Sequence, residues 1–319
     1  MKLEAVIAAF FLNLLVQQST CAFIYEQSAV GGGICVGRIH SSKSSVTKDA
    51  PIQKLTTSLS SSGGESTSGL QFKASTIYKS KDAPLPSSWQ LDELSSFFDT
   101  DNTNFHLLAK GTRNNVEEVP KQQVAMHLHR WAEEARYMGA DEPSLDDTLI
   151  SLTVTTPFLV FILKVTAEIG VKLLWHSFES PRVGNDDGMT ISLPEYQFTL
   201  LDQTFSAHGP QPLVFIFNQL TGINRTVKGT YKQPNHALFV VKAEPSGNKK
   251  RLCFVSRMTA ILNIQFPEIL LNLLPVPKEK IENEGSVSLR RNMQKDVPPG
   301  VDKFRKAYVD WLGHVENEI

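Results

Sequence analysis

The sequence predicts an α+β fold in which a twisted antiparallel sheet packs against amphipathic helices. Three observations predict it: a helical apolar pattern in residues 120–138, an alternating apolar pattern through much of residues 189–266, and helical patterns again toward the C-terminus. Helix, then strands, then helices is an order typical of α+β domains, in which a sheet is covered on one side.

Composition and charge exclude several classes of protein. Of the 319 residues, 41% are hydrophobic, which excludes a wholly disordered chain, a collagen and a multi-span membrane protein. The formal net charge is −1, so no overall field attracts nucleic acid. Cys21 and Cys35 fall in segments that we expect to be removed. The remaining thiol, Cys253, forms neither an internal disulfide nor a cysteine-based zinc site by itself.

The first 22 residues have the pattern of a secretory signal peptide. Ala5–Val16 is apolar apart from one asparagine, and this stretch is too short to cross a bilayer. Small residues, Thr20 and Ala22, stand at the two positions that signal peptidase reads, so we predict cleavage between Ala22 and Phe23. The alternative is a helix that anchors the N-terminus in a membrane or packs in the core.

Residues 23–88 have the composition of a transit peptide. Ser and Thr account for 16 of residues 41–78, and seven basic residues stand against four acidic ones between residues 23 and 88. A segment of this kind buries too little apolar surface to fold, and a basic, acid-poor composition is typical of transit peptides. We predict a disordered transit segment, with a solvated linker as the alternative.

The junction Thr20-Cys21-Ala22-Phe23 resembles the bipartite plastid presequence of algae with complex plastids, in which a signal peptide is followed directly by Phe and a Ser-rich basic stretch. This resemblance implies a plastid (chloroplast) protein that is imported through the secretory route. Secretion is the alternative. The resemblance carries no information about chemistry.

The folded domain is predicted to be a single α+β unit, residues 89–319, after the Pro- and Ser-rich stretch Ala83–Ser88. Phe105–Val119 is predicted to be a strand. Residues 120–138 are predicted to form an amphipathic helix that Gly139 caps. Its apolar residues recur at spacings of four, three, four and three: Val124, Leu128, Trp131, Ala135 and Met138.

Thr156–Trp175 is predicted to be a buried helix. Lys164, Glu168 and Lys172 recur every fourth residue and would line one solvated face, which argues against a transmembrane segment. Because Thr153–Leu163 is rich in β-branched and aromatic residues, the first half could instead be a strand.

Alternating patterns predict strands in the second half of the domain: residues 189–200, 213–217, 237–243 and 251–266. Helical patterns follow: a short helix at residues 267–274, a stripe through Ile281, Leu289 and Met293, and a third over residues 301–315. Pro298-Pro299-Gly300 is predicted to separate the last two helices.

A second resemblance concerns the last third of the chain. The motifs Phe266-Pro267, Leu274-Pro275, Glu284-Gly285, Leu289 and Tyr308-Val309-Asp310-Trp311 resemble an uncharacterised family of plastid and cyanobacterial START-like (helix-grip) proteins. The resemblance implies a curved sheet that grips a long C-terminal helix, with a cavity between them.

No motif for metal, cofactor or nucleophilic chemistry is found, so we expect no catalytic residues, no metal site and no cofactor. His127 and His129 point in different directions on a helix, and no phosphate-binding loop or nucleophile elbow is present. We expect Cys253 to pack as a small apolar residue and the pairs Asp146-Asp147 and Asp186-Asp187 to be solvated turns. Asn224 begins a glycosylation sequon, and a glycan there requires exposure in the endoplasmic reticulum.

A few polar residues interrupt the apolar strands: Glu195, Gln197, Arg257, Asn263 and Gln265. The alternation of the strands places the last three on the side opposite the apolar set, so we expect them to face outward. An inward polar side chain in an apolar cavity would instead indicate a ligand site, whose residues the sequence does not identify.

Three hypotheses for function follow. The first is a non-catalytic plastid protein that binds an apolar small molecule, such as a lipid, a pigment or a pigment precursor, between sheet and helix. The second is an assembly or interaction factor that docks on a plastid membrane complex through an exposed helical face around Lys164, Glu168 and Lys172. The third is a cofactor-free enzyme that uses the same cavity. We expect binding rather than catalysis.

Overall fold

The computed structural model describes a large part of the chain from Gly69 onward. The described residues are 69–85, 94–100, 105–109, 114–158, 161–180, 189–211, 214, 235–246, 251–265 and 276–317. The predicted signal peptide with its cleavage site at Ala22 and Phe23, and most of the predicted transit segment, lie outside them. The predicted helix at residues 267–274 and Asn224 also lie outside, as does the predicted strand at 213–217 apart from Val214.

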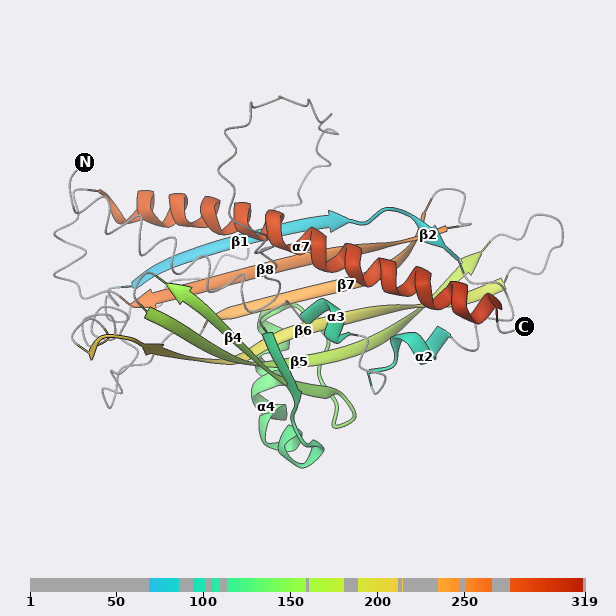
Figure 1. Ribbon diagram of the computed structural model, residues 1–319, viewed down its shortest axis with the longest axis horizontal. Coiled ribbons are helices and arrows are strands. Elements are labelled where there is room, and N and C mark those ends of the chain that lie inside the picture. The colour runs from blue at the N-terminus through green and yellow to red at the C-terminus, as the bar shows by residue number, and fades with distance from the viewer. Residues whose placement is uncertain are drawn as a thin grey trace, which may run out of the picture. The chain divides into compact units, whose positions relative to one another are not determined.

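The described strands form one eight-stranded antiparallel sheet (Figure 1), which confirms the prediction of an antiparallel sheet packed with helices. Along the sheet the order is β1-β8-β7-β6-β5-β4-β3, and the short β2 pairs with β8. From β3 to β8, strands that are adjacent in the sheet are therefore consecutive in the chain. The first strand, β1, instead pairs with the last strand, β8. The strands are β1 (Gly69–Lys79), β2 (Ala83–Pro84), β3 (Asn114–Glu118), β4 (Thr148–Phe158), β5 (Phe161–Ser180), β6 (Met189–His208), β7 (His236–Ser246) and β8 (Arg251–Gln265).

Strand β1 corrects the predicted start of the domain. It lies within residues 23–88, which we predicted to be disordered, and pairs with β8 along its whole length from Gly69 to Lys79. Its alternate residues Leu70, Phe72 and Ala74 are buried, so β1 has the amphipathic pattern of a strand. The Ser-rich composition before it concealed this pattern. The folded domain includes Gly69 and does not start at Trp89.

The predicted helix over Thr156–Trp175 is also wrong, because its described residues, 156–158 and 161–175, belong to β4 and β5. The alternative of a strand in Thr153–Leu163 agrees with the structure. The two strands form a hairpin, and the hydroxyl groups of Thr153 and Thr166 lie 3.1 Å apart across it. A spacing of four residues suits a strand as well as a helix, since four is a multiple of the strand period of two. The charged residues every fourth position therefore share one face of β5.

Four helices are described: α2 (Leu94–Phe98), α3 (His106–Ala109), α4 (Lys121–Met138) and α7 (Lys278–Asn317). The prediction for α4 is confirmed, and Gly139 caps it in the left-handed conformation with φ 75°. The strand predicted over Phe105–Val119 is confirmed only for β3, because its first residues form α3.

Helix α7 continues through Pro298 and Pro299, where we predicted a break. Each proline costs about 3 kcal/mol in a helix interior. A continuous buried stripe opposes this cost, because Leu289, Met293, Val297, Val301 and Phe304 are each at most 1% exposed. Tertiary packing of an apolar face outweighs local propensity here.

The two faces of the sheet carry different partners. Helices α2, α3 and α7 pack with one face, which we call the inner face, in the main hydrophobic core. Helix α4 packs on the opposite, outer face through a second cluster: Val124, Trp131, Ala135, Leu149 and Leu201. Figure 1 shows α7 running along β1 and β8, with α4 on the other side of the sheet.

Candidate functional site

The inner face is uncharged wherever its strand residues are described in β1, β7 and β8. Alternation places Leu70, Phe72, Ala74, Thr76 and Tyr78 of β1 on this face. The inward residues of the two adjoining strands are Ala237, Phe239, Val241 and Ala243 in β7, and Leu252, Phe254, Ser256, Met258, Ala260 and Leu262 in β8. The sheet thus presents an apolar surface to α7.

Three alanines form a row across this surface. Ala74 pairs with Ala260, and Ala260 pairs with Ala237, so the three lie side by side in adjacent strands. All three belong to the inner core and are 1 to 5% exposed. The rows on either side carry larger side chains: Phe72 and Leu262 on one side, and Thr76, Met258 and Phe239 on the other.

Helix α7 passes over the β1 end of the alanine row, at Ala74. The backbone N–H of Lys73 donates to Ser286 Oγ at 3.0 Å, and Tyr78 Oη donates to Asp302 Oδ2 at 2.8 Å. Ala74 lies between these two anchors on β1, so residues 286–302 of α7 lie alongside it. Leu289 and Met293, both fully buried, are the large apolar residues of this section.

This section of α7 carries two carboxylates, Asp296 and the Asp302 that Tyr78 binds. Asp296 is the one that precedes the prolines. It stands three residues after Met293 and four before Gly300, both buried, which places it on the same side of the helix. Burial raises the pKa of Asp296 to about 6, and the charge of Lys295 offsets part of this increase. Sequence patterns did not single out Asp296, because it lies beside the predicted break at Pro298.

Aromatic rings fill the interior beneath the C-terminal half of α7. Phe304 lies against Phe98 and Phe254, with ring centroids 5.9 and 5.3 Å apart, and Tyr308 lies 5.6 Å from Phe254. Tyr196 donates a hydrogen bond of 2.5 Å to the carbonyl oxygen of Phe98. Burial raises the pKa of both Tyr196 and Tyr308, so these phenols stay protonated and act as fixed donors.

The outer face carries the polar chemistry. Three residues of α4 contact three consecutive strands: His127 reaches Glu168 of β5 at 3.3 Å, Arg130 reaches Asp202 of β6 at 3.1 Å, and Glu134 binds His236 of β7. The third pair is the most buried, with both side chains 12 to 13% exposed. These pairs hold α4 across the sheet.

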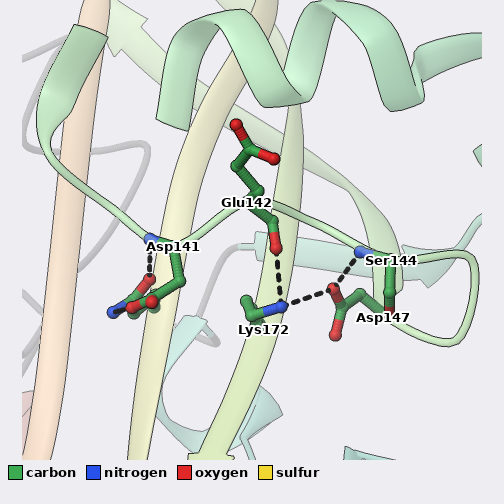
Figure 2. Close-up of polar contacts among 6 residues, drawn as sticks. Asp141, Glu142, Ser144, Asp147 and Lys172 are labelled. Atoms are coloured by element: carbon green, nitrogen blue, oxygen red, sulfur yellow. Dashed lines mark hydrogen bonds and ion pairs between the residues drawn. The ribbon is translucent and has the colours of Figure 1, made fainter. Parts of the chain in front are cut away.

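A polar network joins the loop after α4 to the sheet (Figure 2). Lys172 Nζ donates to the carbonyl oxygen of Glu142 at 2.7 Å and lies 3.4 Å from Asp147 Oδ2, which also accepts from the backbone N–H of Ser144 at 2.6 Å. The side chains of Lys172 and Asp147 are only 15% and 12% exposed. The network therefore fixes the loop, and Asp147 is not the solvated turn residue that we expected.

Gln197 extends this network. Its Oε1 accepts from the backbone N–H of Asp141 at 2.9 Å, and its Nε2 donates to Asp141 Oδ2 and to Glu195 Oε1, each at 2.8 Å. Glu195 Oε2 in turn lies 3.1 Å from His176 Nε2. Glu195 and Gln197 thus serve to attach the loop to the outer face, and neither belongs to the inner face.

The other polar strand residues also lie outside the apolar interior. Arg257 is exposed, and Asn263 Oδ1 accepts from Gln71 Nε2 at 2.8 Å, which confirms the outward prediction for both. The backbone of Gln265 pairs with Gly69, while its side chain lies outside the described part. Asp186-Asp187 likewise lies outside the described residues.

Cys253 is fully buried, and burial raises the pKa of its thiol. Its burial agrees with the predicted packing role, and the raised pKa disfavours the thiolate, which is the reactive form. His127 and His129 have different partners, Glu168 and Glu133, as expected for residues two apart on a helix. Lys164, Glu168 and Lys172 form no helical face, and the latter two are held by His127 and Asp147.

Within the described residues, no three His, Cys, Asp or Glu side chains are grouped so that they could hold a metal ion. No helix in the described part is both long and apolar enough to cross a membrane. In comparisons with known proteins, no family model matches the chain and no curated protein is similar to it.

Proposed function

We propose that this chain is a non-catalytic plastid protein of helix-grip fold that binds an apolar small molecule between α7 and the inner face of the sheet. The observation that carries the proposal is the uncharged inner face with the alanine row Ala74, Ala260 and Ala237, whose β1 end lies alongside residues 286–302 of α7. Binding sites for small molecules are predominantly apolar and carry few polar groups.

The strand order supports the helix-grip part of the proposal. The resemblance implies a sheet that grips a long C-terminal helix, and here β1 lies beside β8 while α7, 40 residues long, packs along both. The plastid location rests on the sequence before Gly69, in particular on the junction at Phe23.

A cofactor-free enzyme is the second candidate, and Asp296 is the observation that favours it. A partly buried carboxyl group with a pKa of about 6 has the properties of a general acid or base near neutral pH. In the binding proposal the same group would instead hydrogen-bond a polar atom of the bound molecule.

Native mass spectrometry of the protein purified from its own cells tests the proposal. We expect an added mass that disappears on denaturation, and this mass identifies the chemical class of the ligand. An Asp296→Asn variant should retain the added mass if the protein only binds. A bare mass, or one seen only with partner subunits, contradicts the proposal and favours the assembly factor.

The plastid location has its own test. Because β1 begins at Gly69, a fusion of residues 1–68 to a fluorescent protein contains the predicted address without any of the sheet. We expect plastid fluorescence that is lost when Phe23 is replaced by Asp. Secretion of the unaltered fusion would contradict the plastid assignment.

A further inference from the structure

The middle of α7 lacks part of its backbone hydrogen bonding. Pro298 and Pro299 have no N–H, so the carbonyl groups four residues earlier, in Gln294 and Lys295, lose their intrahelical donors. Gly300 follows directly and is the least restrained residue in a helix. Three consecutive residues therefore weaken α7 at one point, and prolines are the usual positions at which helices bend.

The two halves of α7 on either side of this point are attached differently. The C-terminal half is held by rings: Phe304 and Tyr308 pack against Phe98 and Phe254, and Tyr308 Oη donates to the carbonyl oxygen of Pro84 at 3.2 Å. Aromatic pairs of this kind contribute beyond their buried area.

The N-terminal half has aliphatic contacts only in its buried stripe, through Leu289, Met293 and Val297. It makes polar contacts with the edge strand β1: Gln71 N–H donates to Glu282 Oε1 at 2.9 Å, and Lys73 N–H donates to Ser286 Oγ at 3.0 Å. Both bonds join a backbone donor to a side-chain acceptor at the periphery of the sheet.

From this asymmetry we infer that residues 278–297 of α7 act as a lid, hinged at Pro298-Pro299-Gly300, that opens at the β1 end of the alanine row while residues 301–317 stay on the sheet. The inference rests on the proposed function, to which it adds the route of entry. Ala74 and Met293 are 4% and 0% exposed when the lid is closed, so a ligand enters at the β1 end of the row only when the lid lifts.

Hydrogen exchange of the ligand-free protein tests the lid. We expect amides in residues 278–297 to exchange at least tenfold faster than those in 301–312. Opening also frees the N–H groups of Gln71 and Lys73, so the amides of these two residues should exchange at the same rate as those of residues 278–297. A Pro298→Ala/Pro299→Ala variant restores two donors and a good helix former, and should slow this exchange at least fivefold. A Pro210→Ala variant, at an exposed proline outside α7, should leave it unchanged.

Equal protection of the two halves, or no change in the double variant, would overturn the lid. Binding of the fluorescent probe 1-anilinonaphthalene-8-sulfonate, measured in parallel, separates this outcome from failure of the proposed function. If the probe binds and exchange is uniform along α7, the lid inference is wrong and the binding proposal stands. Faster exchange of residues 278–297 without probe binding supports the lid and contradicts the binding proposal.

Discussion

The indole ring of Trp131 lies directly against the backbone of Gly170. A Cβ atom on Gly170 would stand 2.2 Å from Cε2 of the indole, a separation that atoms do not tolerate. Trp131 is 1% exposed and belongs to α4, while Gly170 belongs to β5. The absence of a side chain at this one position of the sheet thus allows α4 to pack closely on the outer face.

A Gly170→Ala variant is therefore expected to be destabilised. Because the added methyl group forces Trp131 or β5 to move, we expect the free energy of unfolding to fall by about 2 to 3 kcal/mol, within the range for overpacked sites. Denaturant titration measures it. Gly313→Ala is the matched control, since a Cβ there meets no atom within 4 Å. Equal effects of the two substitutions would contradict the role of Gly170.

Gly139 gives a prediction of backbone strain without crowding. Its φ is 75°, and a Cβ there has no atom within 4 Å. A Gly139→Ala variant should lose about 1 kcal/mol of stability, because the left-handed conformation costs an L-residue that amount. A Gly139→Asn variant should lose less, since Asn tolerates this conformation better. Thermal denaturation of the three proteins tests the order.

The ion pair of Lys172 and Asp147 should contribute more to stability than an exposed pair. Removal of the lysine leaves Asp147, only 12% exposed, without its counter-charge and Glu142 without a donor to its carbonyl. We expect Lys172→Ala to cost about 1 to 3 kcal/mol, as for a buried group left unpaired. Arg136→Ala should cost less than about 0.5 kcal/mol, because Arg136 and Glu142 are exposed. Similar losses in both variants would refute this difference.

Asp296 predicts a pH dependence of stability. Its pKa is about 6 in the folded protein against 3.8 for an ordinary Asp, so the folded state holds its proton more tightly than the unfolded state. Its contribution to stability is therefore present below pH 3.8 and is lost as the pH rises through 6. After allowance for solvent screening we expect a loss of roughly 1 to 2 kcal/mol between these values.

An Asp296→Asn variant should remove this slope. We expect it to be more stable than the unaltered protein at pH 7 and nearly equal at pH 4, as measured by denaturant titration at both values. Asp310→Asn, which replaces an exposed carboxylate of the same helix, serves as the control and should leave the slope in place. If the stability of the Asp296→Asn variant changed with pH in the same way as that of the unaltered protein, Asp296 would not be the source of the slope.

Local patterns predicted the parts of the fold that are determined locally. Helix α4 has a clear 3.6-residue period and a Gly cap, and strands β6, β7 and β8 have clear alternation. Thr156–Trp175 was misassigned because a four-residue repeat of charges fits both periods. The break at Pro298 was wrong because burial of the stripe through Phe304 involves residues distant in sequence.

The candidate site depended on strand register, which the sequence does not contain. Pairing between strands determines two features of the site. It lets Glu195 and Gln197 attach the loop after α4. It also brings together a row of three alanines: Ala74, Ala260 and Ala237. β-branched and apolar residues in alternation set the faces of a strand but leave its partner open. The outward position of Arg257 and Asn263 was predictable, because alternation alone decides it.

The pairing of β1 with β8 determines the order in which the sheet can be completed. Lys79 ends the first strand and Arg251 begins its partner, so roughly 170 residues are synthesised between them. Because translation adds about 5 to 20 residues per second, β8 is synthesised about 10 to 35 s after β1. The hairpins from β3 to β8 form between neighbours in sequence, whereas β1 closes a long loop and joins late. Helix α7 is synthesised last and packs on β1, so it can pack on the sheet only after β1 has paired with β8.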